Sequence, residues 1–349
     1  MRISFTVALA ALALSSTTNG LKILMNNDDG FGSGNLRELY KLLKGAGHDV
    51  LIVAPAVQQS GQGGRSEFTA YANLTSPAQY NIVQAGAPAV GTDPNDSNIW
   101  YYNGTPAACT FVALDYVLPR YYASWNRAPD LFIAGPNYGV NLGPFVYTLS
   151  GTLGATYAAV SRSIPGIALS ASNDAIPYFN VTNTTNPATW AAKASLKVVQ
   201  SFIDNTPANS QILPLGYGVN VNIPPLDSDA IPPITKARLT GEAETDIAVF
   251  NETTKLFKYG DLRPLAAGVN VCYNGDCELP GETFVVNGGN VSVSLFTIDY
   301  TAPKIGYTEA VFAKIGGLFE ESGNATKTVK RGMEGRGKIL KGRDVSREE

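Results

Sequence analysis

Histidine is nearly absent from this sequence. Its 349 residues include one, His48, so chemistry that needs a histidine nucleophile or several histidine metal ligands is excluded. A Ser-His-Asp hydrolase would need His48 as its base and a Gly-X-Ser-X-Gly turn for its nucleophile, and that turn is missing. His48 directly precedes a predicted strand, which favours a structural role.

Cysteine is almost as scarce, with three residues. Cys272 and Cys277 flank Asn274-Gly275, a strong hairpin signal that brings the two sulfurs together, so we expect a disulfide between them. Cys109 is left over, and no arginine follows it six residues later, which excludes the phosphate loop of enzymes with a cysteine nucleophile. Its apolar helical surroundings indicate a small buried hydrophobe.

Basic clusters and long apolar runs are also missing. The net charge is -3 and no run of Lys and Arg interrupts the first three hundred residues, so nucleic-acid polymers are not expected partners. The apolar run at residues 3–14 is shorter than the roughly 20 residues of a membrane span, so no membrane partner is expected. It follows Arg2 and precedes small polar residues, the layout of a secretory signal peptide over residues 1–20. We therefore expect a secreted, extracellular protein.

Asn-X-Ser/Thr sequons are frequent, and several would carry glycan in a secreted eukaryotic chain, which predicts a glycoprotein. The eight sequons begin at Asn73, Asn95, Asn103, Asn180, Asn183, Asn251, Asn290 and Asn324.

Strand and helix patterns alternate over the first two thirds of the chain. An apolar strand at residues 21–25 precedes a helical pattern that Asn35 can cap, and a second strand follows at residues 49–55. Such a crossover makes the two strands parallel. The alternation continues and predicts an α/β, Rossmann-like three-layer α/β/α domain with a mostly parallel sheet over residues 21–230.

The texture changes near residue 231. β-prone pieces with turns, at residues 269–272, 283–286 and 291–300, predict a smaller β-rich C-terminal extension over residues 231–318, a candidate for oligomerisation. Residues 319–349 lose apolar periodicity and are rich in Lys and Arg, which predicts a mobile charged tail.

Two adjacent carboxylates, Asp28 and Asp29, follow the first strand. Neighbouring side chains of a strand point to opposite faces, so the two can serve one site only if the chain leaves the strand there, which Gly30 allows. Two carboxylates at the carboxyl end of a strand suit a hard divalent cation such as Mg²⁺ or Mn²⁺. The alternative is a solvated turn.

Other polar loops should meet the same edge of the sheet, where ligands bind in such folds. A glycine-rich loop after the second strand carries Ser60, and the loop at residues 135–143, after the strand at residues 131–134, carries Asn137 and Asn141.

Ser150-Gly151-Thr152 then opens a helix. Free backbone N–H groups and two hydroxyls at a helix start can cradle a phosphate. Simple N-capping is the alternative, and the residues alone do not decide between them.

Five motifs in this order and spacing resemble the SurE family of survival-protein nucleotidases. They are Asn27-Asp28-Asp29-Gly30, Ala54-Pro55 followed by Gln59-Ser60-Gly61, Asn103-Gly104-Thr105-Pro106, the loop from Gly135 to Gly143, and Ser150-Gly151-Thr152-Leu153-Gly154-Ala155. The resemblance is strong over residues 21–172 and thin beyond 225. It implies metal-dependent phosphatases that hydrolyse nucleoside monophosphates and other small phosphomonoesters, usually as homodimers or homotetramers.

The resemblance also assigns roles position by position. The implied metal ligands are Asp28, Asp29, Ser60 and Asn137, and the implied phosphate-bordering residues are Asn141, Gly151 and Thr152. Ser150, at the same helix start, is a further candidate phosphate contact, and Asp28 and Asp29 are the candidate catalytic residues.

The chain departs from the family pattern in two ways. Ala134-Gly135-Pro136-Asn137 stands where the family has Ser-Gly-Ile-Asn, and Pro136 removes a backbone donor beside an implied ligand. The signal-like N-terminus and the sequons indicate a secreted eukaryotic, fungal branch, some members of which are described as acid phosphatases.

A non-catalytic binding module that retains the fold is the alternative function. A dinucleotide enzyme is disfavoured, because Asp28 and Asp29 put negative charge where a pyrophosphate would bind.

Overall fold

The computed structural model describes residues 20–126 and 128–319. The predicted signal peptide, except for residue 20, the charged tail beyond residue 319 and the sequon at Asn324 lie outside the described residues. Within the described part of the chain, no helix is long and apolar enough to cross a membrane.

The described residues form a nine-stranded sheet as their main element. Neighbouring strands are parallel except for β3 with β4 and β7 with β11, which are antiparallel. In sheet order the strands are β3 (Val90–Asp93), β4 (Asp96–Tyr102), β2 (Asp49–Pro55), β1 (Lys22–Asn26), β5 (Leu131–Tyr138), β6 (Gly166–Ala171), β7 (Tyr217–Ile223), β11 (Val291–Thr297) and β8 (Ile234–Ala237).

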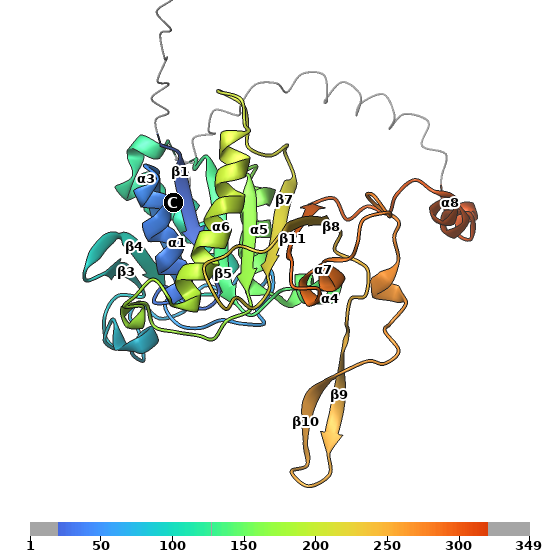
Figure 1. Ribbon diagram of the computed structural model, residues 1–349, viewed down its shortest axis with the longest axis horizontal. Coiled ribbons are helices and arrows are strands. Elements are labelled where there is room, and N and C mark those ends of the chain that lie inside the picture. The colour runs from blue at the N-terminus through green and yellow to red at the C-terminus, as the bar shows by residue number, and fades with distance from the viewer. Residues whose placement is uncertain (1–19, 127, 320–349) are drawn as a thin grey trace, which may run out of the picture. The chain divides into compact units, whose positions relative to one another are not determined.

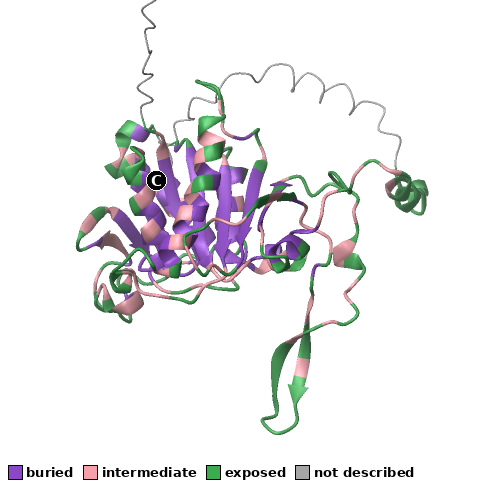
Figure 2. Cartoon of the chain, viewed as in Figure 1, coloured by how far each residue is buried: buried purple, intermediate pink, exposed green. Residues whose placement is uncertain are grey.

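Helices cover both faces of this sheet (Figure 1). On one face, α1 (Gly34–Gly45) and α6 (Pro187–Asp204) pack against alternate strand residues such as Ile23 and Met25. On the other, α5 (Gly151–Ser161) and the helical segment that starts with α2 (Pro106–Val112) cover residues such as Leu24. The central strands of this sheet, from β2 to β7 in sheet order, are mostly buried (Figure 2). The Rossmann-like three-layer prediction is confirmed.

Shorter helical segments complete this domain. They include a π-helical turn (Ala113–Val117), α3 (Leu118–Tyr121) and α4 (Gly143–Leu149). The predicted cap of the first helix is wrong. Ser33 is the residue before the first turn of α1, and the Asn35 side chain instead exchanges two hydrogen bonds of 3.0 Å with Asn173.

The C-terminal extension is β-rich, as predicted, and two of its strands join the main sheet. β8 and β11 extend the sheet beyond β7, while β9 (Asp246–Asn251) and β10 (Leu256–Asp261) form a separate antiparallel hairpin. The two remaining strand predictions are wrong. Residues 283–286 lie in helix α7 (Glu282–Asn287), and residues 269–272 contain only part of a short 3₁₀ turn (Gly268–Asn270). A short apolar run does not distinguish a strand from a short helix.

Both cysteine predictions are confirmed. Cys272 and Cys277 form a disulfide, and Cys109 is a free, buried thiol whose pKa is raised by its burial. The described residues 301–319 group separately from the rest and contain α8 (Gly306–Ala313) and its flanking turns.

Candidate functional site

The chain leaves β1 through a tight, buried turn. Asn26 Nδ2 donates to Pro106 O at 2.8 Å. Asn27 closes the turn, because its Oδ1 accepts from Gly30 N at 3.2 Å and its Nδ2 donates to Gly30 O at 3.1 Å. Gly30 has a φ of +97°, which favours glycine. Asp28 and Asp29 are only 2 % and 3 % exposed, so this is not a solvated turn.

The Asp28 carboxylate lies against the start of α5. Thr152 Oγ1 donates to Asp28 Oδ1 at 2.6 Å, and the backbone N–H groups of Gly151 and Thr152 also face the carboxylate. Gly151 permits this approach, since a Cβ there would lie 2.7 Å from Asp28 Cβ. Burial raises the pKa of Asp28, and these hydrogen bonds oppose the rise.

Asp29 links the turn to the end of β5. Its Oδ2 accepts from Tyr138 N at 2.9 Å, which brings it to the residue after Asn137. Burial raises the pKa of Asp29 well above its ordinary value, and the negative charge of Asp28 raises it further. Two buried carboxylates this close together favour a proton or a cation between them.

Asn137 offers the same region an uncommitted oxygen. Its Nδ2 donates to Tyr138 O at 2.9 Å and to Gly139 O at 2.8 Å, which fixes the side chain. Its Oδ1 is buried and has no hydrogen-bond partner among the described residues. The register between β5 and β6 shifts between Ala134 and Asn137, where Pro136 has no N–H for the ladder.

Ser60 lies in the surface part of its loop. Gln59 N donates to Asp28 O at 2.7 Å, so the loop is attached to the turn at residues 26–30, the carboxylate turn. Ser60 itself is exposed, and its hydroxyl accepts from Gln58 Nε2. Gly154 of α5 allows the loop to approach the helix closely, since a Cβ at Gly154 would lie 1.9 Å from Gly63 O.

Asn141 is held in a buried network at the ends of β6 and β7. Its backbone N donates to Asn222 Oδ1 at 2.7 Å, and its backbone O accepts from Asn220 and Asn222, each at 3.1 Å. Its side-chain Nδ2 donates to Ser170 Oγ at 2.7 Å. This residue therefore has one well-defined orientation.

Ser150 acts as the cap of α5, since its Oγ accepts from Leu153 N at 3.4 Å. With the Thr152 hydroxyl bound to Asp28, the helix start is joined to the carboxylate turn. Asp28, Asp29, Asn137, Ser150, Gly151 and Thr152 thus belong to one connected buried region, whereas Ser60 stands at its surface.

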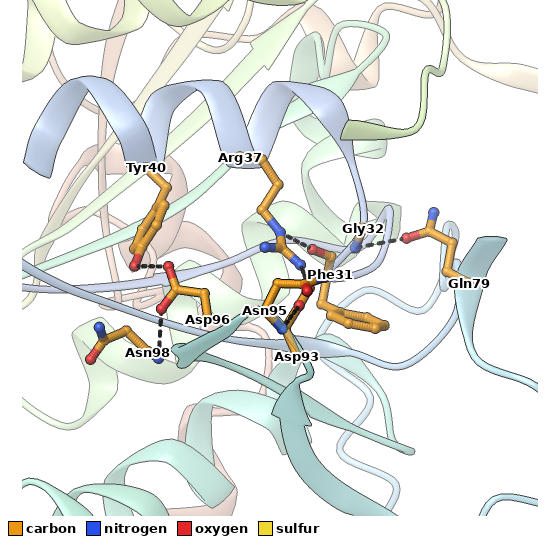
Figure 3. A network of polar contacts seen from close by, with 9 residues as sticks. All are labelled: Phe31, Gly32, Arg37, Tyr40, Gln79, Asp93, Asn95, Asp96 and Asn98. Carbon is orange, nitrogen blue, oxygen red and sulfur yellow. Dashed lines mark hydrogen bonds and ion pairs between the residues drawn. The ribbon is translucent and has the colours of Figure 1, made fainter. Parts of the chain in front are cut away.

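The loop that follows Asp29 is fixed from the side of α1 and β3 (Figure 3). Arg37 Nε donates to Phe31 O at 2.6 Å, and its guanidinium pairs with the buried carboxylate of Asp93. Gln79 bonds to the two backbone groups that flank this turn, accepting from Gly32 N at 3.1 Å and donating to Asp29 O. These contacts hold the turn in place.

Three residues at the site escaped the sequence analysis. Tyr138 and Gln79 hold the carboxylate turn. Glu282 bonds to Gly143 N at 2.6 Å, from a position more than a hundred residues later in the chain. Tyr138 stands next to Asn137 within a glycine-rich loop, which is a usable signal, but nothing local marks Gln79 or Glu282.

The residues present fit a hard divalent cation. They offer carboxylate and amide oxygens, and Asn137 Oδ1 accepts no hydrogen bond from any residue that the structure describes. Among residues 20–126 and 128–319, no group of three or more His, Cys, Asp or Glu side chains could hold a metal. A cation at this site would therefore depend on neutral oxygens beside the two aspartates.

Comparisons with known proteins identify the family of this chain. The family model "Survival protein SurE" matches residues 23–246. The chain is 43 % identical over 304 residues to an acid phosphatase of Yarrowia lipolytica, covering 84 % of each chain, which supports the predicted fungal branch. It is 35 % identical over 150 residues to a 5'-nucleotidase SurE of Desulfovibrio desulfuricans, covering 43 % of this chain and 49 % of the bacterial one.

The fold agrees as well. The crystal structure of the SurE protein of Aquifex aeolicus superposes with a TM-score of 0.57 at 24 % identity, over 85 % of this chain and 98 % of the bacterial chain. The family model matches most of the chain, and the carboxylate turn, the Asn137 loop and the start of α5 meet at one edge of the sheet. This protein therefore belongs to the SurE family.

Proposed function

We propose that this protein is a phosphatase that hydrolyses small phosphomonoesters, such as nucleoside monophosphates, with the help of a divalent cation, Mg²⁺ or Mn²⁺. The observation that carries the proposal is the pair of buried carboxylates, Asp28 and Asp29, together with the buried Oδ1 of the nearby Asn137, which has no hydrogen-bond partner within the described part of the chain. The family relatives named acid phosphatase and 5'-nucleotidase support the reaction class.

Each site residue has a proposed role that follows from its position. Asp28, Asp29 and Asn137 would hold the cation, with Ser60 a ligand only if its loop brings the hydroxyl inward from its surface position. When bound, the cation supplies charge neutralisation and activation of water. Asn141 would border the phosphate, with Gly151 and Thr152 at the helix start adding positive helix-end charge.

The buried setting serves the same chemistry. Charge interactions are stronger away from water, so fixed N–H donors and carboxylates stabilise a developing charge more than they would at the surface. The Thr152 hydroxyl holds the Asp28 carboxylate in one orientation, and the Tyr138 N–H does the same for Asp29. The chain thus prepares the site before substrate arrives.

Hydrolysis of p-nitrophenyl phosphate tests the proposal, from acid to mildly alkaline pH, with Mg²⁺, Mn²⁺ or EDTA. Asp28→Asn keeps the size of the side chain but removes its charge, and Asp115→Asn is the matched control, since Asp115 pairs with Arg162 on the surface. We expect EDTA and Asp28→Asn to abolish activity and Asp115→Asn to leave it unchanged.

Two other outcomes would contradict the proposal. A folded protein without activity under any cation would favour a binding module that retains the fold. Activity that survives both EDTA and Asp28→Asn would place the chemistry elsewhere.

We also propose that the protein is secreted and assembles as a homodimer or homotetramer. The Cys272–Cys277 disulfide supports an oxidising compartment. Detection in the culture medium and sedimentation of the purified protein would test the two statements.

A further inference from the structure

Glu282 is a fully buried carboxylate at the start of α7, outside the part of the chain that the family model matches. Its Oε1 accepts from Gly143 N at 2.6 Å, and its Oε2 accepts from Ser294 Oγ at 2.7 Å and Asn220 Nδ2 at 3.1 Å. One side chain therefore joins the start of α4, strand β7 and strand β11.

Two of these contacts lead to Asn141, the residue proposed to border the phosphate. Gly143 lies two residues after it in the same loop, and Asn220 Nδ2 also donates to Asn141 O at 3.1 Å. The loop at residues 139–143 is thus held on one side by the asparagines of β7 and on the other by Glu282.

A buried carboxylate without a counter-charge lowers the folding stability of the chain. Removing a carboxylate from water costs free energy unless it is paired, and no ion pair of the described residues includes Glu282. Strand β11 does not need this side chain for its place, since it pairs with β7 from Ser292 to Thr297. The contact with a helix-start N–H instead favours a carboxylate over a neutral group.

We propose that Glu282 is a positioning residue for the phosphate-bordering loop, fixing Asn141 through Gly143 N and Asn220. The C-terminal segment then forms part of the catalytic structure, and not only an extension of the sheet. That Glu282 affects phosphate binding rests on the proposed phosphatase function. That Glu282 holds the loop at residues 139–143 does not depend on that function.

Glu282→Ala tests the role, with Ser294→Ala as the matched control. Both variants remove a hydrogen bond of the same carboxylate cluster, but only the first releases Gly143 N. The first measurement is hydrogen exchange of the segment 139–149. The second is kcat and KM for p-nitrophenyl phosphate, together with inhibition by inorganic phosphate.

We expect Glu282→Ala to speed exchange at Gly143, and to raise KM and the inhibition constant of phosphate by about tenfold, because a hydrogen bond to a charged group is lost. We expect kcat to change less, because the carboxylate turn is untouched, and Ser294→Ala to match wild type in exchange and kinetics. If Glu282→Ala does not fold, Glu282→Asp replaces it, since its carboxylate is one methylene short of Gly143 N.

A folded Glu282 variant with wild-type exchange and kinetics would overturn the proposal, as would equal effects of the Glu282 and Ser294 variants. The statements about phosphate binding and about the loop fail separately. An inactive wild-type protein would refute the phosphatase function, while the exchange measurement would still decide whether Glu282 holds the loop.

Discussion

Replacing Glu282 with glutamine should remove a pH-dependent part of the folding stability. Burial raises the pKa of Glu282 from its ordinary value of 4.5 to about 7, although hydrogen bonds from Gly143, Ser294 and Asn220 oppose the rise. Below pH 4.5 the carboxyl is protonated in both the folded and the unfolded chain, and its stabilising contribution is fully present. As the pH rises towards 7 the unfolded chain loses this proton first, so the contribution is lost.

The size of the effect follows from the two pKa values. The difference between about 7 and 4.5, at about 1.4 kcal/mol for each pH unit, gives about 3.5 kcal/mol in total, of which about 3 kcal/mol is lost between pH 4.5 and 8. Glutamine does not titrate, so any cost of fitting its amide between Asn220 and Ser294 is the same at every pH.

Urea unfolding of wild type and Glu282→Gln at three pH values between about 4.5 and 8 checks this, with EDTA present throughout. Asp28 and Asp29 titrate in both proteins, so their contributions cancel when the two free energies of unfolding are subtracted. We expect wild type to lose about 3 kcal/mol relative to the variant as the pH rises. A difference that stays constant with pH would show that Glu282 is not a buried group with a raised pKa.

Two further substitutions test the rest of the site. Gly151→Ala places a Cβ 2.7 Å from Asp28 Cβ. The new methyl group should push the Asp28 carboxylate away from α5 and lower kcat/KM by about 10- to 100-fold. Gly45→Ala, with no atom within 4 Å of the new Cβ, is the control and should be as active as wild type. Equal activity of the two variants would refute the need for close approach. Arg37→Met leaves the buried Asp93 carboxylate without its cation and should cost about 3–5 kcal/mol in urea unfolding. Most of that loss should be recovered in Arg37→Met/Asp93→Leu, and a single variant as stable as wild type would contradict this.

The local sequence was sufficient where a short stretch carries its own physical constraint. The strand at residues 49–55 and the Cys272–Cys277 disulfide depend on periodicity or on a nearby turn, and the structure has both. The alternation of strands and helices also predicted the layer architecture, because crossovers between parallel strands leave few topologies.

The prediction was weaker where a side chain had more than one polar partner within reach. Asn35 has the character of a cap, but it pairs instead with Asn173, which no local pattern identifies. Residues 283–286 have β-branched residues yet form a helix, because burial against β11 and the contact of Glu282 with Gly143 outweigh a weak propensity.

For the site, the sequence by itself determined the donor chemistry and the edge of the sheet at which the donors gather. Polar loops after parallel strands must emerge at one edge, and this brought Asp28, Asp29 and Asn137 into one hypothesis. Only the tertiary structure decided how these groups are held: the Thr152 bond to Asp28, the Tyr138 bond to Asp29, and the approach of Glu282 from the far end of the chain. Such contacts depend on distances between segments that are remote in sequence, and periodicity and spacing carry no information about those distances.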